Sequence, residues 1–216
     1  MSVSSAVVSF ALVAGLLTIM PGLDTAMVLR SAIRNGPRSA FATAFGVGTG
    51  ALVWGAAAAV GVSALLTTST MAYAGLRIVG AGYMVWLGAR LIWTSVIHRS
   101  PAPAAEAVEV EDGNGDGDRL GRAWRQGVLT NLLNPKIGAF YVAVLPQFIP
   151  EHTAALPMGL LLAFVHDLEG LLWFSVLIFG AARMGELLRR RTAQRVVDGG
   201  TGSVLIGFGL KLGLTG

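Results

Sequence analysis

The stretch TIMPGLDTAMV, residues 18–28, is an apolar run interrupted by Pro21, Gly22 and Asp24. Proline removes a backbone N–H donor, and its ring clashes with the preceding helical turn. In hydrocarbon, the backbone groups that lose their helical partners must be satisfied by neighbouring helices, water or a ligand. This stretch therefore predicts a break in what would otherwise be a plain membrane-spanning helix.

A second stretch, TNLLNPKIGAFY at residues 130–141, is interrupted in a similar way by Asn134, Pro135 and Lys136. The two interrupted stretches lie at corresponding places in the two halves of the chain. Paired hydrophobic segments broken by proline beside ionisable groups are typical of the binding site of a transporter. The rest of the chain is interpreted as the scaffold around these two breaks.

The composition indicates a polytopic membrane protein. The chain has 216 residues, of which 54% are hydrophobic and only 13% charged, and its mean hydropathy is +0.66; a soluble domain needs no such composition. The basic residues occur in short clusters between apolar segments, which favours lipid headgroups and not nucleic acid as their partners. The absence of cysteine excludes disulfides and thiolate metal sites. Residues 1–9 lack a basic region, so the first segment is expected to be a retained helix.

Six apolar segments have about the length that spans a bilayer. They cover roughly residues 6–29, 40–66, 72–97, 127–149, 154–182 and 197–214. The sequence therefore predicts an all-α fold with six transmembrane helices, of which the first and fourth are broken.

Two three-helix halves, residues 1–99 and 127–216, are separated by an acidic segment rich in Gly and Pro at residues 100–126. Because each half has an odd number of helices, the halves would be oppositely oriented, which predicts a 3+3 inverted repeat. The segment between them is expected to be a cytoplasmic linker, disordered over residues 100–118.

The basic residues predict the orientation. If successive helices alternate in direction, 13 of the 16 basic residues fall on one side, Arg77 and Lys211 on the other, and Lys136 within the fourth segment. The positive-inside rule then puts the basic loops in the cytoplasm and both termini outside.

Chemistry at the breaks favours a zwitterionic ligand. The half-helix that begins at Pro21 directs free N–H groups and its positive dipole end towards the break, which suits a carboxylate. Carbonyl groups freed before the break suit an ammonium group. The candidate substrate-binding residues are Thr18, Pro21, Gly22, Asp24, Asn131, Asn134, Pro135 and Lys136.

Structural roles remain open for several of these residues. The prolines could only kink their helices, and Asp24 could cap its half-helix instead of binding a ligand or proton. Asn131 and Asn134 could hold helices together by hydrogen bonds. Lys136 could pair with Asp24 or extend to the cytoplasmic surface.

The fifth segment contains His166, Asp167 and Glu169 within LLAFVHDLEGLLWF. Helical spacing places positions 166 and 169 on one face and Asp167 about a quarter-turn away. No metal site is predicted, because H-D-x-E lacks a second His. His and carboxylates at membrane depth are instead candidates for proton transfer, so His166, Asp167 and Glu169 join Asp24 as proton-coupling candidates. Gly46 and Gly50 have the spacing that allows close helix packing, as do Gly209 and Gly213.

The chain resembles the LysE/RhtB-type amino-acid exporters, on motifs that cover nearly all of it outside the acidic segment. They are PGLD at residues 21–24, the basic turn that ends at Gly36, FGVGTG at 45–50, GAGYMVWLGARL at 80–91 and GVLTNLLNPKIGAFYVAVLPQFI at 127–149. Many relatives have PGP where this chain has Pro-Gly-Leu, which affects the shape of the first break.

The resemblance implies a secondary-active exporter of amino acids or close derivatives in the bacterial inner membrane, driven by the proton motive force, with no cofactor and no enzymatic turnover. The substrate would lie between the first and fourth helices, which would work by alternating access. The alternative is a cation or metal-ion exporter, and the lack of cysteine disfavours soft metals. The sequence does not decide whether the protein forms a homo-oligomer.

Overall fold

The computed structural model describes residues 2–20, 22–68, 116–150 and 152–181, with isolated positions between 71 and 93 and between 203 and 210. Every regular element in these residues is a helix, which confirms the all-α prediction for this part of the chain. Pro21, Gly209, Gly213 and most of the predicted third and sixth segments, 72–97 and 197–214, lie outside the described residues. The six-helix repeat therefore stays a prediction.

The first predicted segment, 6–29, is divided into two helices at the first break. Helix α1, Val3–Ile19, begins at Ser2, whose hydroxyl accepts a hydrogen bond from the Ser5 N–H at 3.2 Å. It ends where the Met20 N–H donates to the Leu17 carbonyl at 3.3 Å. Helix α2 then begins at Leu23. The break falls where the proline pattern predicts it.

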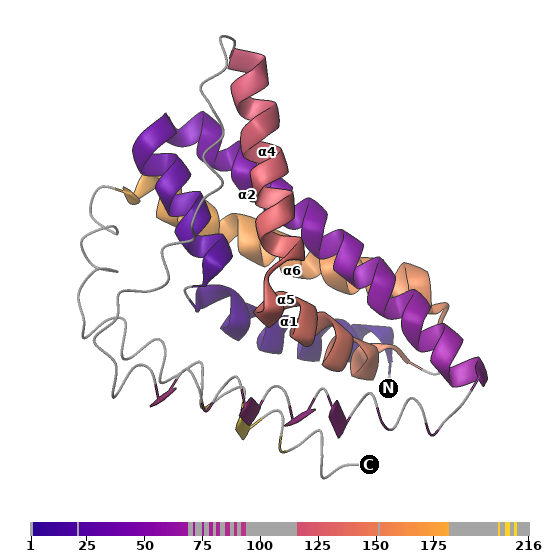
Figure 1. Cartoon of the computed structure of the whole chain (residues 1–216). Helices are drawn as coiled ribbons and strands as arrows, with labels where there is room; N and C mark the ends of the chain where they lie inside the picture. Colours follow the sequence, from indigo (N-terminus) through magenta and orange to yellow (C-terminus); the bar gives the residue numbers. More distant parts are fainter. Residues whose placement is uncertain are drawn as a thin grey trace.

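Helix α2, Leu23–Thr68, contains the turn predicted at residues 34–37. Gly36 has φ 82° and ψ 174° and Pro37 follows it, so two helices meet at this residue without a longer loop. A positive φ is readily adopted only by glycine, and proline is well tolerated at the first position of the helix that follows. The path of α2 changes direction at this kink (Figure 1).

The fourth predicted segment is also divided. Helix α4, Asp116–Leu132, is followed by α5, Pro135–Ala143, and by the short 3₁₀ helix η1, Leu145–Phe148. The two arms of this pair are bent by 58°. Asn134 caps α5 by accepting the Lys136 N–H at 3.1 Å, and Pro135 occupies the first turn.

The start of α4 corrects the sequence prediction. The sequence predicts that the fourth segment begins at about residue 127, but α4 begins at Asp116, so residues 116–126 of the predicted linker are helical. The polar composition of residues 116–126 does not indicate a membrane-spanning helix. In the structure, the first turns of α4 project beyond the other described helices (Figure 1). Whether residues 100–126 act as a linker between two halves stays a prediction.

Helix α6, Ala155–Phe179, agrees with the fifth predicted segment, 154–182. Two described helices are long and apolar enough to cross a membrane, Leu23–Gly61 and Ala155–Phe179, and the bent pair that starts in α4 would be a third. Helix α2 packs along both α4 and α6, and α1 packs on α6. Residues at both breaks line one cavity together with His166 and Asp167, which places the breaks beside the middle of α6.

Helices α2 and α4 approach so closely that their backbones touch. A Cβ atom on Gly46 would overlap the carbonyl of Trp124, and a Cβ on Gly127 would overlap the carbonyl of Thr43. On the same face of α2, a Cβ on Gly50 would lie 2.7 Å from Asn131 Oδ1. The prediction that Gly46 and Gly50 allow close packing is confirmed.

Candidate binding site at the two helix breaks

The two breaks meet at a cavity of about 60 Å³ enclosed by residues of α1, α2, α4, α5 and α6. Eight of the residues predicted from sequence line it: Thr18, Gly22, Asp24, Asn131, Asn134, Lys136, His166 and Asp167. Pro21 lies outside the described residues, and neither Pro135 nor Glu169 is among the lining residues. Segments far apart in sequence are thus brought to one place, whereas the roles of the individual residues stay predictions.

Asp24 lies in the first turn of α2 and is 8% exposed. Its Oδ2 atom accepts a hydrogen bond of 2.9 Å from the Asn131 side-chain amide, across 107 positions of the chain. Its Oδ1 atom is buried without a hydrogen-bond partner among the described residues. A buried acceptor of this kind is costly unless something binds to it, so Asp24 is a candidate for a ligand or proton.

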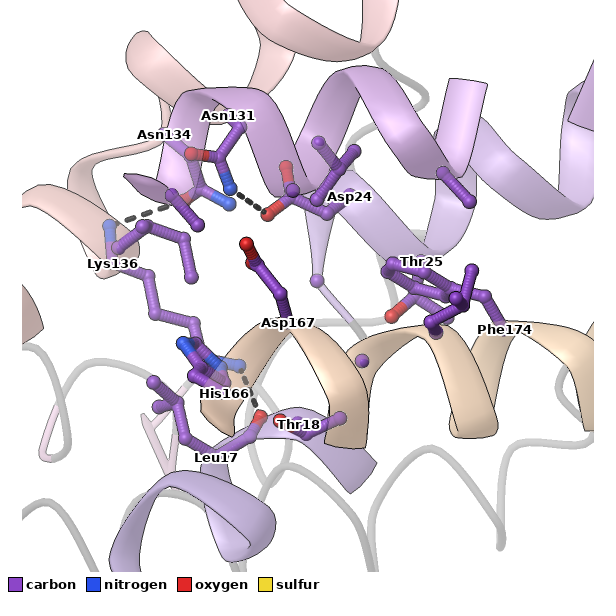
Figure 2. Close-up of a pocket in the computed structure, with 18 of the residues that line it drawn as sticks. Leu17, Thr18, Asp24, Thr25, Asn131, Asn134, Lys136, His166, Asp167 and Phe174 are labelled. Carbon is purple, nitrogen blue, oxygen red and sulfur yellow. Dashed lines mark hydrogen bonds between the residues drawn. The ribbon is translucent and has the colours of Figure 1, made fainter. Parts of the chain in front are cut away.

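Lys136 connects the second break to the first. Its Nζ atom donates to the carbonyls of Leu17 and Met20, at 3.2 and 3.3 Å, at the end of α1. The sequence predicts that carbonyls before the break suit an ammonium group, and here the chain itself supplies that group. The negative end of the α1 dipole adds to this attraction. The Lys136 side chain therefore points to the first break (Figure 2).

Two of the predicted polar residues have local hydrogen bonds within their own segments. Asn134 caps α5, as described above, and its side chain faces the same space as Asn131 and Asp24 (Figure 2). The Thr18 hydroxyl donates to the Ala14 carbonyl at 2.9 Å within α1. Both residues can still contact a ligand, since both line the cavity.

The polar residues of α6 separate into two sets. Asp167 points from α6 towards the space below Asn131 and Asp24 (Figure 2). Its carboxylate lies 3.4 to 3.5 Å from the position of a Cβ on Gly48, so this glycine gives the carboxylate room against α2. Glu169 instead faces α1, where its Oε1 lies 3.4 Å from a Cβ position on Gly15. Of these two carboxylates, only that of Asp167 belongs to the cavity.

His166 lines the cavity and is hydrogen-bonded on its far side. Its Nδ1 atom and the Tyr141 hydroxyl are 3.0 Å apart, and both side chains are buried. Tyr141 holds the imidazole in place from α5. Among the described residues, no group of three or more His, Cys, Asp or Glu side chains is arranged to hold a metal ion.

Apart from Gly22, the apolar and small residues of the cavity are not among the site residues predicted from sequence. The lining of α6 follows two series with a spacing of four, His166, Gly170 and Phe174, and Asp167 and Leu171. This spacing explains why His166 and Asp167 share the cavity while Glu169 does not, contrary to the face expected from sequence. The same rule, applied forward from the two polar residues, identifies Leu171 and Phe174. No sequence pattern indicates that Gly48 lines the cavity or that Tyr141 binds His166.

A buried carboxylate at a pair of helix breaks, enclosed by apolar helices long enough to cross a bilayer, defines the class of a polytopic membrane protein with a central polar site. A family model described as "LysE type translocator" matches residues 16–216. The chain belongs to this family, which confirms the resemblance seen in its motifs, and it is a membrane transport protein.

Individual relatives cover nearly the same length. The chain is similar to the uncharacterized membrane protein YrhP of Bacillus subtilis, with 28% identity over 94% of this chain and 96% of the relative. It is 28% identical to a leucine efflux protein of Enterobacter sp., over 91% of this chain and 89% of the relative. It is 26% identical to a threonine efflux protein of Salmonella typhi, over 89% of each. No solved structure matches the chain.

Proposed function

We propose that this protein exports amino acids or close derivatives across the bacterial inner membrane, in exchange for protons and by alternating access. The observation that carries the proposal is the cavity at which both helix breaks meet, with the buried Asp24 carboxylate and its unpartnered Oδ1 atom. The leucine and threonine efflux relatives support an amino acid as the substrate.

The carboxylates supply the site for the substrate's ammonium group. Asp24 and Asp167 approach the cavity from α2 and α6, so a cation between them would be attracted by both (Figure 2). The amide of Asn131 holds Asp24 in place through its other oxygen. A proton on either carboxylate weakens the attraction for the ammonium group, so that protonation and substrate release are linked.

The size of the cavity and the position of the breaks support alternating access. About 60 Å³ is room for only a few water molecules, so the described conformation is too contracted for an amino acid. Because α1 and α2, and likewise α4 and α5, are separate helices, one arm of each pair can move without breaking the hydrogen bonds of the other. Movement at the breaks would widen the cavity towards one side of the membrane at a time. In this proposal both termini lie outside.

Purified protein in liposomes tests this function. Vesicles are loaded with radiolabelled leucine or threonine and given a pH gradient, and the released label is followed. We expect the gradient to accelerate release by the native protein. Asp24→Asn and Asp167→Asn should lose this acceleration, whereas Glu169→Gln, altered in the same helix but outside the cavity, should keep it.

The outcomes separate the parts of the proposal. Acceleration that survives in Asp24→Asn would remove Asp24 from proton coupling. Native protein that releases no amino acid, and that instead raises the metal tolerance of cells producing it, would replace the proposal with a cation exporter.

A further inference from the structure

The cavity has two ends of different chemistry. Lys136 and His166 lie at one end and Thr25 and Phe174 at the other, with Asp24 and Asp167 between them (Figure 2). The packing of the core divides in the same way. Leu17, Met20, Ala51 and Ile137 belong to one hydrophobic cluster, and Ala44, Val47 and Phe174 to another.

The end at Phe174 is apolar. Four lining residues pack together in one cluster there, Ala44 and Val47 of α2 and Leu171 and Phe174 of α6. Thr25 is the polar residue beside Phe174 (Figure 2). None of the described residues that line this end carries a charge. A lysine or arginine side chain placed there would bring its charge into an apolar wall without a carboxylate partner, which is strongly unfavourable.

Phe174 closes this end. It is 7% exposed and packs in one cluster with Val28, Ala40, Leu177 and Ile178. One turn earlier, a Cβ on Gly170 would lie 3.9 Å from the Phe174 ring, so the ring extends over a position that has no side chain. The ring therefore fills space into which a longer substrate would have to extend.

We infer that the end of the cavity at Phe174 receives the side chain of a neutral, aliphatic amino acid, and that the Phe174 ring sets the upper limit on the size of that side chain. The inference rests on the proposed function, since it assumes that the ammonium group lies between Asp24 and Asp167. With the ammonium group at that place, the apolar end is the part of the cavity whose chemistry matches an aliphatic side chain. Phe174 is thus a specificity-determining residue.

Efflux of four labelled amino acids from liposomes tests the inference, with leucine, phenylalanine, threonine and lysine compared in parallel. We expect the native protein to release leucine faster than phenylalanine, and to release no lysine. Phe174→Ala should raise the ratio of phenylalanine to leucine release by about tenfold. A hydrophobic pocket typically discriminates by about this factor between substrates that differ by a methylene-sized group. Phe174→Leu should shift the ratio in the same direction by less.

A matched control is Phe164→Ala, in the same helix but 52% exposed and outside the cavity. It should keep the native ratio. Phe174→Leu decides the question if Phe174→Ala fails to fold, because it nearly conserves the packed volume. An unchanged ratio in the folded Phe174 variants, or lysine as the preferred substrate of the native protein, would overturn the inference while leaving amino-acid export intact. Absence of all amino-acid release from the native protein would instead refute the proposed function itself.

Discussion

The contact between α2 and α4 gives a prediction whose sign and size follow from the structure. Gly46→Ala would place a methyl group on the Trp124 carbonyl, and Gly127→Ala would place one on the Thr43 carbonyl. Overpacking costs about 1–3 kcal/mol in general. Because the obstacle here is backbone and not a flexible side chain, we expect each change to lower the free energy of unfolding by about 2–3 kcal/mol, in the upper part of that range.

Two glycines of the same helices provide controls of opposite sign. Among the described residues, nothing lies within 4 Å of a Cβ on Gly61 in α2 or on Gly121 in α4. Replacing a glycine inside a helix by alanine without a clash stabilises by roughly 0.5–1 kcal/mol. Gly61→Ala and Gly121→Ala should therefore raise the free energy of unfolding, while Gly46→Ala and Gly127→Ala lower it.

Equilibrium unfolding in mixed micelles of a mild detergent and SDS, followed by circular dichroism, measures these differences. The double variant Gly46→Ala/Gly127→Ala should cost less than the sum of its single changes, since one separation of the helices relieves both overlaps. Efflux should fall as well, because separation moves Asn131 away from Asp24. If Gly46→Ala or Gly127→Ala proves as stable as its control, the described approach of α2 and α4 is wrong.

Three further predictions concern the site and the orientation. Asn131→Leu removes the amide that binds Asp24 Oδ2, so we expect a loss of about 1–3 kcal/mol in unfolding free energy and slower efflux; equal stability to the native protein would show that the bond contributes nothing. Lys136→Met removes the hydrogen bonds to the Leu17 and Met20 carbonyls, so amide hydrogen exchange near residues 17–26 should accelerate, with partial recovery in Lys136→Arg. Unchanged exchange would show that Lys136 does not stabilise the end of α1. The chain has no cysteine, so single cysteines at two exposed positions, Ser4→Cys and Asn35→Cys, can be labelled in intact cells with an impermeant maleimide. We expect labelling of Ser4→Cys alone, since the termini are predicted outside and the basic turn inside. The reverse pattern would contradict the predicted orientation.

The sequence predicts the breaks well because proline acts locally. An apolar run that contains proline has to interrupt its helical hydrogen bonds near that residue, whatever surrounds it. The ends of α1 and α5 and the turn at Gly36 follow from such local rules. The same is true of α6, whose apolar length is visible in the sequence.

The partners of the polar groups are set by tertiary packing and are not visible in the sequence. Lys136 could be assigned to Asp24 or to the membrane surface, and nothing local indicates the carbonyls of Leu17 and Met20. The sequence does not predict the early start of α4, because residues 116–126 are too polar to resemble a membrane-spanning segment. The one local indication of a helix there is the spacing of four positions between Leu120 and Trp124.

The hydrogen bonds at the cavity join the two breaks crosswise. Asp24 follows the first break and is bound by Asn131, which precedes the second. Lys136 follows the second break and binds the end of α1, which precedes the first. A shift of α1 relative to α5 therefore strains the Lys136 bonds, and a shift of α2 relative to α4 strains the bond of Asp24. A substrate at the Oδ1 atom of Asp24 leaves the Asn131 bond in place and acts directly on only one of these two connections, the one between α2 and α4. Under the proposed function, binding can thus move one pair of helices while the other pair stays tied, which is the asymmetry that access from one side at a time requires.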